Sequence, residues 1–226
     1  AHGRITFEDV AGVDEAKSDL SEIVEFLRDP GKFQRLGGKI PRGVLLLGPP
    51  GTGKTSVARL LADATQLAFV QISAIFSGVA DLKKVFEEAR TKRRAGQGTL
   101  LFVDEIHRFN RAQQDSFLPV MEDGTITLIG ATTENPSFEL NAALLSRARV
   151  MTFRSLDPQA ISHLLQRAEE LEERKLPLDE DAREALIIMA DGDGRAALTL
   201  AEDVWKAVPS DQHLDVAQLA KVVHRR

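Results

Sequence analysis

What the sequence lacks already narrows the kinds of protein that it can encode. Its 226 residues include no cysteine, so disulfides and thiolate-bound metals are excluded. The longest apolar run beside a motif, at residues 44–47, is far too short to cross a membrane, and no basic-then-apolar segment opens the sequence as a signal peptide would. A net charge of −5 gives no general excess of positive charge for nucleic acid. We therefore expect a cytoplasmic protein without a membrane segment, in which any DNA contact depends on a local patch.

The alternation of apolar segments predicts the fold of most of the chain. Hydrophobic residues make up 43% of the sequence and charged residues 28%, which is typical of a globular protein. Up to about residue 155, short apolar runs alternate with segments of helical spacing, and this alternation favours a parallel sheet with helices on both faces. The predicted strands lie at 44–47, 68–72, 100–103, 126–129 and 150–153, and the predicted helices of this part lie at 13–27, 53–65, 81–94 and 110–121.

The pattern changes near residue 155, which we interpret as a domain boundary. Asp157 and Pro158 form a good helix start, and no strand is predicted beyond them. A length of 226 residues also fits one large domain with a smaller one. We therefore expect an α/β domain over 1–154, beginning with an extended arm at 1–12, and an all-α domain over 155–226. Helices of the second domain are predicted near 158–174, 179–190 and 195–207.

A phosphate-binding loop follows the first predicted strand. Its residues satisfy the pattern G-x-x-x-x-G-K-S/T and lie between a buried strand and a helix, which is the context that this motif requires. The glycines let backbone amides turn toward phosphate oxygens, while Lys54 can reach the β- and γ-phosphates and Thr55 can bind Mg²⁺. The alternative, a glycine-rich turn that matches by chance, does not account for the context. The residues that we expect to hold the nucleotide here are Gly48, Pro49, Pro50, Gly51, Thr52, Gly53, Lys54, Thr55 and Ser56.

Two carboxylates follow the strand predicted at 100–103. They are Asp104 and Glu105, and ligands of a parallel sheet bind beyond the carboxyl ends of its strands. Asp104 can therefore reach the metal ion, directly or through water, and Glu105 can orient and polarise the attacking water. Such a pair is, by itself, more often a helix cap or a solvated turn. Its place in the same sheet, 50 residues after Lys54, favours the functional interpretation.

Together, the two motifs resemble those of the AAA+ ATPase family, and the resemblance extends over nearly the whole sequence. It implies a P-loop α/β core with a five-stranded parallel sheet flanked by helices, followed by a small C-terminal all-α lid. It also implies that the protein binds ATP and ADP with Mg²⁺, hydrolyses ATP, and assembles with copies of itself into a ring.

The same resemblance assigns roles to four further polar residues. Thr133, in the segment 130–135, would be the first sensor of the nucleotide state. Arg147 would be the finger that reaches the γ-phosphate of a neighbouring subunit, with Arg149 in reserve. Arg195 would be the second sensor, supplied by the lid. Each arginine alone is more often part of a surface salt bridge, and only their order along the chain favours these roles.

The first part of the chain resembles one branch of the family. Residues 5–55 are similar to the ATPase domain of the membrane-anchored AAA+ proteases called FtsH, with the closest matches at 6–17 and 26–38. This resemblance implies that the adenine pocket is lined by Val10, Ala11 and Gly12.

The rest of the chain resembles a different branch. Residues 58–207 are similar to the replication-associated recombination factors called RarA or MgsA. The sequence therefore predicts a chimera, natural or engineered, that is joined in or near the phosphate loop. The segments that match this second branch best are 69–74, 77–79, 104–110, 130–138 and 190–200.

Departures from both branches keep three functions open. Residues 73–79 lack an aromatic–apolar–glycine pore signature, so we expect Phe76 to be packed or half-exposed. No histidine fits His-Glu-x-x-His, so a zinc site is not expected. RarA-type proteins continue into an oligomerisation domain that has no counterpart here.

The favoured function is an ATPase acting on replication-fork DNA. The alternatives are an FtsH-type unfolding ATPase without its protease, and a nucleotide-binding module with little turnover because ring assembly is impaired.

One cationic cluster offers a local patch for DNA. Arg90, Lys92, Arg93 and Arg94 end the helix predicted at 81–94 and could contact a phosphate backbone. A favourable cationic helix end is the preferred interpretation, and no aromatic residues are interleaved for stacking on bases. DNA as a partner therefore rests on the RarA resemblance.

Overall fold

The computed structural model describes residues 21, 23–25, 27–28, 43–133, 140–209 and 211–223. The expected N-terminal arm with Val10, Ala11 and Gly12 lies outside the described residues, as do residues 134 and 135 of the expected sensor segment. Of the helix predicted at 13–27, the described residues from 21 onward are helical.

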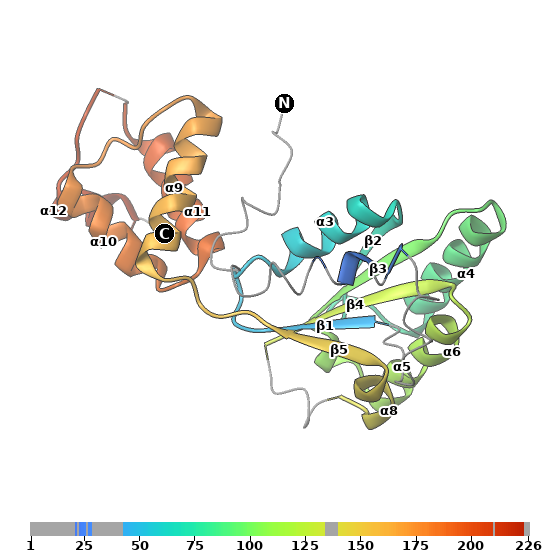
Figure 1. Ribbon diagram of the computed structural model, residues 1–226. Coiled ribbons are helices and arrows are strands. Elements are labelled where there is room, and N and C mark those ends of the chain that lie inside the picture. Colours follow the sequence, from blue (N-terminus) through green and yellow to red (C-terminus); the bar gives the residue numbers. More distant parts are fainter. Residues whose placement is uncertain are drawn as a thin grey trace. The chain divides into compact units, whose positions relative to one another are not determined.

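The described strands form one parallel sheet. They are β1 (Gly43–Leu47), β2 (Ala68–Ser73), β3 (Thr99–Asp104), β4 (Ile126–Thr132) and β5 (Ala148–Thr152). Their order is β2-β3-β4-β1-β5, and every neighbouring pair is parallel (Figure 1). Leu47 is in register with both Thr132 and Thr152, so the carboxyl ends of β1, β4 and β5 are level. The predicted five-stranded parallel sheet is confirmed.

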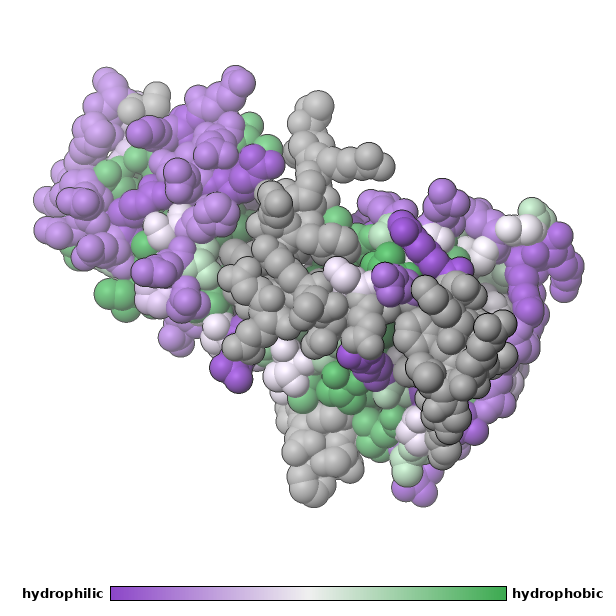
Figure 2. Space-filling view, viewed as in Figure 1, coloured by the Kyte–Doolittle hydropathy of each residue, from purple (hydrophilic) through white to green (hydrophobic). Residues whose placement is uncertain are grey.

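Helices cover this sheet on both faces, also as predicted. Figure 1 shows α3 (Lys54–Thr65) on one side and α5 (Arg111–Asp115), α6 (Phe117–Glu122) and α8 (Ala142–Ser146) on the other. α4 (Val79–Arg94) begins two residues before its predicted start, because the Asp81 carboxylate accepts a hydrogen bond from the Gly78 amide, at 2.8 Å, and caps it. The surface over α4 is hydrophilic (Figure 2).

The prediction of one continuous helix at 110–121 is wrong, because the structure has two short helices there. The chain ends α5 at Asp115 and begins α6 at Phe117, with Ser116 between them. Pro119 has no amide to donate to the Asp115 carbonyl, which explains a break at this point, and the first turn of a new helix tolerates proline.

The core of the α/β unit lies around the inner strands and the helices packed on them. Leu45, Leu101 and Val103 are fully buried on β1 and β3. Phe117 of α6 is the centre of an aromatic group, because its ring lies 5.5 Å from that of Phe86 and 5.8 Å from that of Phe109, centroid to centroid. Each such pair contributes about 0.5–1.5 kcal/mol beyond its buried area. This packing holds α4 and α6 against the sheet and so fixes the segments that follow its strands.

The described residues of the C-terminal part form helices, as predicted, together with one isolated β-bridge between Leu178 and Leu214. Asp157 caps α9 (Pro158–Glu172) by accepting from the Ala160 amide at 2.7 Å, and Asp179 and Asp193 cap α10 (Glu180–Ala190) and α11 (Gly194–Ala207) in the same way. The helix α12 (Val216–Val223) was not predicted. Its signal in the sequence is Asp215 followed three residues later by Gln218, which cap each other's backbone amides at 2.8 and 2.9 Å.

The chain folds as two compact units. Of the described residues, the helical unit takes 154–209 and 211–223 together with Pro49–Gly53 of the phosphate loop, and the α/β unit takes the remainder. Within the described residues, no helix combines the length and the apolar character that are needed to cross a membrane.

Candidate functional site

The phosphate loop is anchored at the carboxyl edge of the sheet. The Gly48 amide donates to the Thr132 carbonyl at the end of β4 (3.1 Å), and the Phe153 amide donates to the Leu47 carbonyl at the end of β1 (2.7 Å). Gly48 has φ +155, and a Cβ at this position would lie 2.3 Å from the Phe153 carbonyl oxygen. Only glycine therefore allows the loop to leave β1 at this angle.

The tip of the loop contacts the start of α11. The Gly51 carbonyl accepts from the Gly194 amide (3.0 Å), and a Cβ on Gly51, whose φ is +73, would lie 1.7 Å from a carboxylate oxygen of Asp193. Asp193 is held there because the same oxygen accepts from the Arg195 amide at 2.9 Å. The side chain of Thr52 is buried and donates to the Pro49 carbonyl at 2.9 Å. The loop is thus a defined structure, and its contacts explain why glycine is needed at its tip.

Lys54 begins α3 with its ammonium group held by backbone carbonyls. Its side chain donates to the Gly48 carbonyl and, at 3.5 Å, to that of Thr132, and the residue is only 8% exposed. A buried charge is tolerated only when it is hydrogen-bonded. Thr55 and Ser56 follow in the first turn of α3 and are partly exposed. An ammonium group and a helix N-terminus at one place form a site suited to phosphate.

The two carboxylates lie at the end of β3, as expected. β4 alone separates β3 from β1, so this end lies about 10 Å from the start of the phosphate loop. Asp104 accepts from the Glu105 amide at 3.1 Å. Glu105 has φ +55, in the left-handed region that residues other than glycine rarely adopt, and such strain of about 1–3 kcal/mol is concentrated at functional sites. The hydroxyl of Thr55 and the carboxylate of Asp104 are oxygen donors of the kind that Mg²⁺ prefers.

His107 is a residue of this site that the sequence analysis missed. It belongs to the 3-10 helix η2 (Ile106–Arg108), and its side chain is 6% exposed. Its Nε2 lies 3.1 Å from a carboxylate oxygen of Glu105, and its Nδ1 lies 2.8 Å from the Thr132 hydroxyl. An ionised Glu105 only accepts, so Nε2 donates to it, and in a neutral ring Nδ1 accepts from Thr132. The sequence offered one faint signal, a histidine two positions after Glu105.

These contacts form one continuous polar network. The Thr132 carbonyl accepts a hydrogen bond from Lys54, and the Thr132 hydroxyl is hydrogen-bonded to His107. His107 in turn contacts the Glu105 carboxylate. The network therefore runs from the lysine of the phosphate loop to the second carboxylate after β3. Thr133, the expected first sensor, follows Thr132 directly and is exposed.

The expected arginine residues lie in different surroundings. Arg147 follows α8, donates from Nε to Glu122 at 2.7 Å and from Nη1 to the Ala143 carbonyl at 3.1 Å. Arg149 lies on β5 and is half-buried. Arg195 is the second residue of α11, and its side chain is exposed beside Gly194, whose amide binds the tip of the phosphate loop.

Phe76 corrects an expectation about the loop between β2 and α4. It is 87% exposed, neither packed nor half-buried, and Ile75 and Val79 beside it are exposed too. The Phe76 amide donates to the Ser73 carbonyl at 3.2 Å in a turn directly after β2, and this turn holds the ring beyond the end of the strand. The prediction was wrong because no pattern in the sequence reports where such a turn points.

The chain matches the sequence model of the family described as "ATPase family associated with various cellular activities (AAA)" over residues 44–156, and it belongs to this family. The family is one of nucleotide-binding proteins, in agreement with the geometry of the loop. The fold is similar to that of a mutant of RuvB from Thermotoga maritima, with a TM-score of 0.70 and 25% identity over 94% of this chain and 70% of that one.

Relatives from both expected branches are found. Replication-associated recombination protein A of Escherichia coli is 48% identical over 179 residues, which are 74% of this chain and 40% of that protein. ATPase WRNIP1 of Dictyostelium discoideum is 46% identical over 172 residues, covering 74% of this chain and 20% of the relative. ATP-dependent zinc metalloprotease FtsH of Caulobacter vibrioides is 43% identical over 162 residues, covering 69% and 25%. The chain thus spans well under half the length of these relatives. Both resemblances are confirmed, and the chimeric origin stays a prediction.

Proposed function

We propose that this chain is an AAA+ ATPase module that binds Mg-ATP on residues 48–56 and hydrolyses it to ADP and phosphate. Residues 1–154 form the nucleotide-binding domain in this proposal, and residues 155–226 form the lid. The observation that supports it best is the polar network from Lys54 to Glu105, because it connects a phosphate-binding lysine to a carboxylate that can act on water.

The residues divide the work as follows in this proposal. Lys54 binds the β- and γ-phosphates once they replace its carbonyl partners. Thr55 and Asp104 hold Mg²⁺, whose charge would offset that of the phosphate oxygens when it is bound. Glu105 orients the attacking water and accepts its proton. Val10, Ala11 and Gly12 line the adenine pocket, and Thr133 and Arg195 sense the nucleotide.

His107 is the positioning residue for Glu105 in this mechanism. It fixes one carboxylate oxygen of Glu105 at 3.1 Å, which leaves the other oxygen to accept from water. Its second contact, with Thr132, keeps the ring from turning, and Thr132 also receives Lys54. A carboxylate held in this way loses little entropy when it engages the water.

Arg147 is the proposed arginine finger for a neighbouring subunit. In the chain alone it is paired with Glu122, and the two side chains are 37% and 53% exposed. Exposed pairs of this kind contribute at most about 1 kcal/mol, so a γ-phosphate of a second copy can displace Glu122 at little cost. Turnover then rises as the chain assembles into a ring. A module that assembles poorly would bind ATP and turn it over slowly, which is the alternative function.

The cellular task that we propose is replication and recombination of DNA, in the cytoplasm. It is supported by the 48% identity to the replication-associated relative. The competing proposal, protein unfolding of the FtsH type, is supported by the 43% identity to the protease. Stimulation of the ATPase by forked DNA but not by unfolded protein would favour the first.

Calorimetry with Mg-ATP tests the common basis of both proposals. We expect binding of adenine nucleotide to the folded chain. If magnesium and ATP produce no binding heat across a range of temperatures, and ATP causes no shift in thermal unfolding, the proposed function is wrong.

A further inference from the structure

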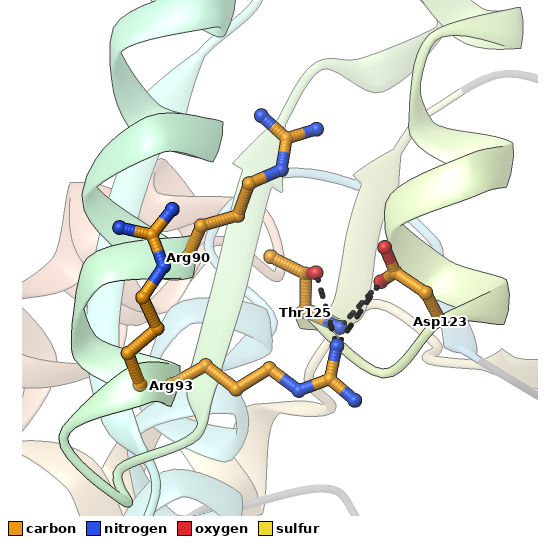
Figure 3. Close-up of a pocket in the computed structure, with 5 residues that line it drawn as sticks. Arg90, Arg93, Asp123 and Thr125 are labelled. Atoms are coloured by element: carbon orange, nitrogen blue, oxygen red, sulfur yellow. Dashed lines mark hydrogen bonds and ion pairs between the residues drawn. The ribbon is translucent and has the colours of Figure 1, made fainter.

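A recess on the α/β unit is lined by three arginines. The last turns of α4 supply Arg90, Arg93 and Arg94, and the turn from α6 to β4 supplies Asp123 and Thr125 (Figure 3). The recess has a volume of about 410 Å³, within the range of roughly 300–1,000 Å³ that is usual for ligand sites. All three arginines are exposed, so the recess is open to solvent.

Arg93 reaches across this recess to the turn on its other side. Its Nη1 lies 3.7 Å from a carboxylate oxygen of Asp123 and 3.5 Å from the Thr125 hydroxyl, as the dashed lines in Figure 3 mark. Between these two residues, Gly124 has φ +80, and a Cβ there would lie 3.5 Å from Nη2 of Arg93. The turn thus contacts one of the three guanidinium groups.

Asp123 neutralises only one of the three charges. The hydrogen bond with the Thr125 side chain lowers the pKa of Asp123 below its ordinary value, and Arg93 and Arg90 lower it further. Asp123 is therefore ionised at neutral pH. Among the described residues, neither Arg90 nor Arg94 has an ion pair or a hydrogen bond with another side chain. The recess keeps an excess of two positive charges.

A cationic helix end explains only part of this arrangement. The macrodipole favours positive charge within the last turn, which here holds Lys92, Arg93 and Arg94. Arg90 lies one turn earlier, so the macrodipole does not account for its place on the wall of the recess. The charges also converge on one volume because the Asp123–Thr125 turn closes its far side.

The recess lies at the amino ends of the strands, whereas the nucleotide site lies at their carboxyl ends. α4 leads into the amino end of β3, and the turn at Asp123 and Thr125 leads into the amino end of β4. The phosphate loop and Asp104 follow carboxyl ends instead. β3 has six residues, so the two sites are separated by about 20 Å. A ligand of the recess is therefore distinct from the ATP of the loop.

We propose that this recess binds phosphate groups of a DNA strand. Guanidinium groups form paired hydrogen bonds with phosphate oxygens. The openness of the recess and the hydrophilic surface over α4 (Figure 2) suit a strand that passes across it better than a small enclosed anion. The lining contains no aromatic ring for bases to stack on, so recognition is of the backbone and independent of sequence. The choice of DNA as the polyanion rests on the proposed function.

The test compares two double variants of the full chain that lose the same charge from the same helix. Arg90→Gln with Arg94→Gln removes the two uncompensated arginines and keeps the Arg93 pair. Lys83→Gln with Lys84→Gln removes two exposed cations of α4 that do not line the recess. Binding of labelled forked DNA is measured by fluorescence anisotropy from 50 to 200 mM salt (roughly the range over which phosphate contacts are revealed).

We expect the arginine variant alone to lose affinity, for two DNA sequences equally. Loss of two phosphate contacts makes the negative slope of log K against log salt shallower by about 1.8 and lowers the affinity at 0.1 M salt by up to roughly 60-fold. Its basal ATPase and thermal unfolding stay as in the parent chain.

Three results would overturn the proposal. They are equal losses in both variants, no loss in the arginine variant, and displacement of DNA from the parent chain by inorganic phosphate at constant ionic strength, which would identify a small-anion site. A chain that hydrolyses ATP but binds no DNA refutes this proposal and leaves the ATPase intact. A chain that binds DNA through the arginines but binds no nucleotide supports this proposal and refutes the proposed ATPase function.

Discussion

Replacement of His107 by leucine tests the mechanism at its least expected residue. The change removes two hydrogen bonds, the contact with Glu105 at 3.1 Å and that with Thr132 at 2.8 Å. It also places an apolar side chain in a buried site, which offsets the lost hydrogen bonds, so the free energy of unfolding changes by no more than about 1–2 kcal/mol. The fold therefore survives, and a change in turnover reports on Glu105.

The kinetic effect is larger than the effect on stability. When the Glu105 carboxylate is no longer oriented, kcat falls roughly 10- to 100-fold. This fall is equivalent to an increase of about 1.4–2.7 kcal/mol in the activation barrier. We expect KM for ATP to stay unchanged, because the side-chain contacts of His107 are with Glu105 and Thr132. His107→Gln restores much of kcat, since its amide can donate to Glu105 and its carbonyl can accept from Thr132.

A double-mutant cycle shows whether His107 acts through Glu105. Steady-state phosphate release is measured for His107→Leu, Glu105→Gln and the double variant. If the two residues work as a unit, leucine costs nothing further once Glu105 is gone. The reasoning is refuted if His107→Leu leaves kcat unchanged in a folded chain, or if it lowers kcat by the same factor in both backgrounds.

Three further changes test other parts of the site. Glu105→Gln should bind ATP normally in calorimetry and lower phosphate release about 10²–10⁴-fold; unchanged turnover would remove Glu105 from the role. Arg147→Ala should keep ATP binding but lose the turnover that rises with protein concentration. Glu122→Ala, which removes the ion-pair partner of Arg147 within the chain, should keep that turnover. Equal losses in both variants would contradict the role of Arg147 as an arginine finger. Gly51→Ala should lower thermal stability and ATP affinity because its Cβ meets a carboxylate oxygen at 1.7 Å. Gly96→Ala, at φ +87 with nothing within 4 Å of the added Cβ, is the control for backbone strain alone (about 1–3 kcal/mol). If both alanine variants are destabilised equally, the steric clash at Gly51 is not the cause.

The fold was predictable from the sequence because its signals are local and periodic. The three inner strands are short apolar runs, and Asp157 and Pro158 mark a helix start that the structure reproduces. Two details were not predictable in this way. The break at Ser116 depends on one missing amide, that of Pro119, and α12 is a short helix whose capping pair was overlooked.

The candidate site was predictable only where a motif fixes a residue's place. Lys54 and Glu105 follow strands whose ends meet at one edge of a parallel sheet, so their proximity follows from the fold class. The contact of His107 with Thr132 joins residues 25 positions apart. It depends on the direction in which η2 turns after Glu105, and no spacing rule reports that direction. The same holds for Arg147, whose partner Glu122 is also 25 positions away.

The exposure of Phe76 changes the balance between the two cellular tasks. Protein unfolding was disfavoured because residues 73–79 lack a pore signature, yet the structure presents an aromatic ring there at 87% exposure. An exposed aromatic at a loop tip can contact an unfolded chain as well as a nucleic acid. The preference for DNA then depends on the replication-associated relatives. Phe76→Ala separates the two tasks: loss of stimulation by unfolded protein, with DNA stimulation absent from the parent chain, would assign this chain to unfolding. Stimulation by forked DNA that disappears with Arg90 and Arg94 would assign it to DNA.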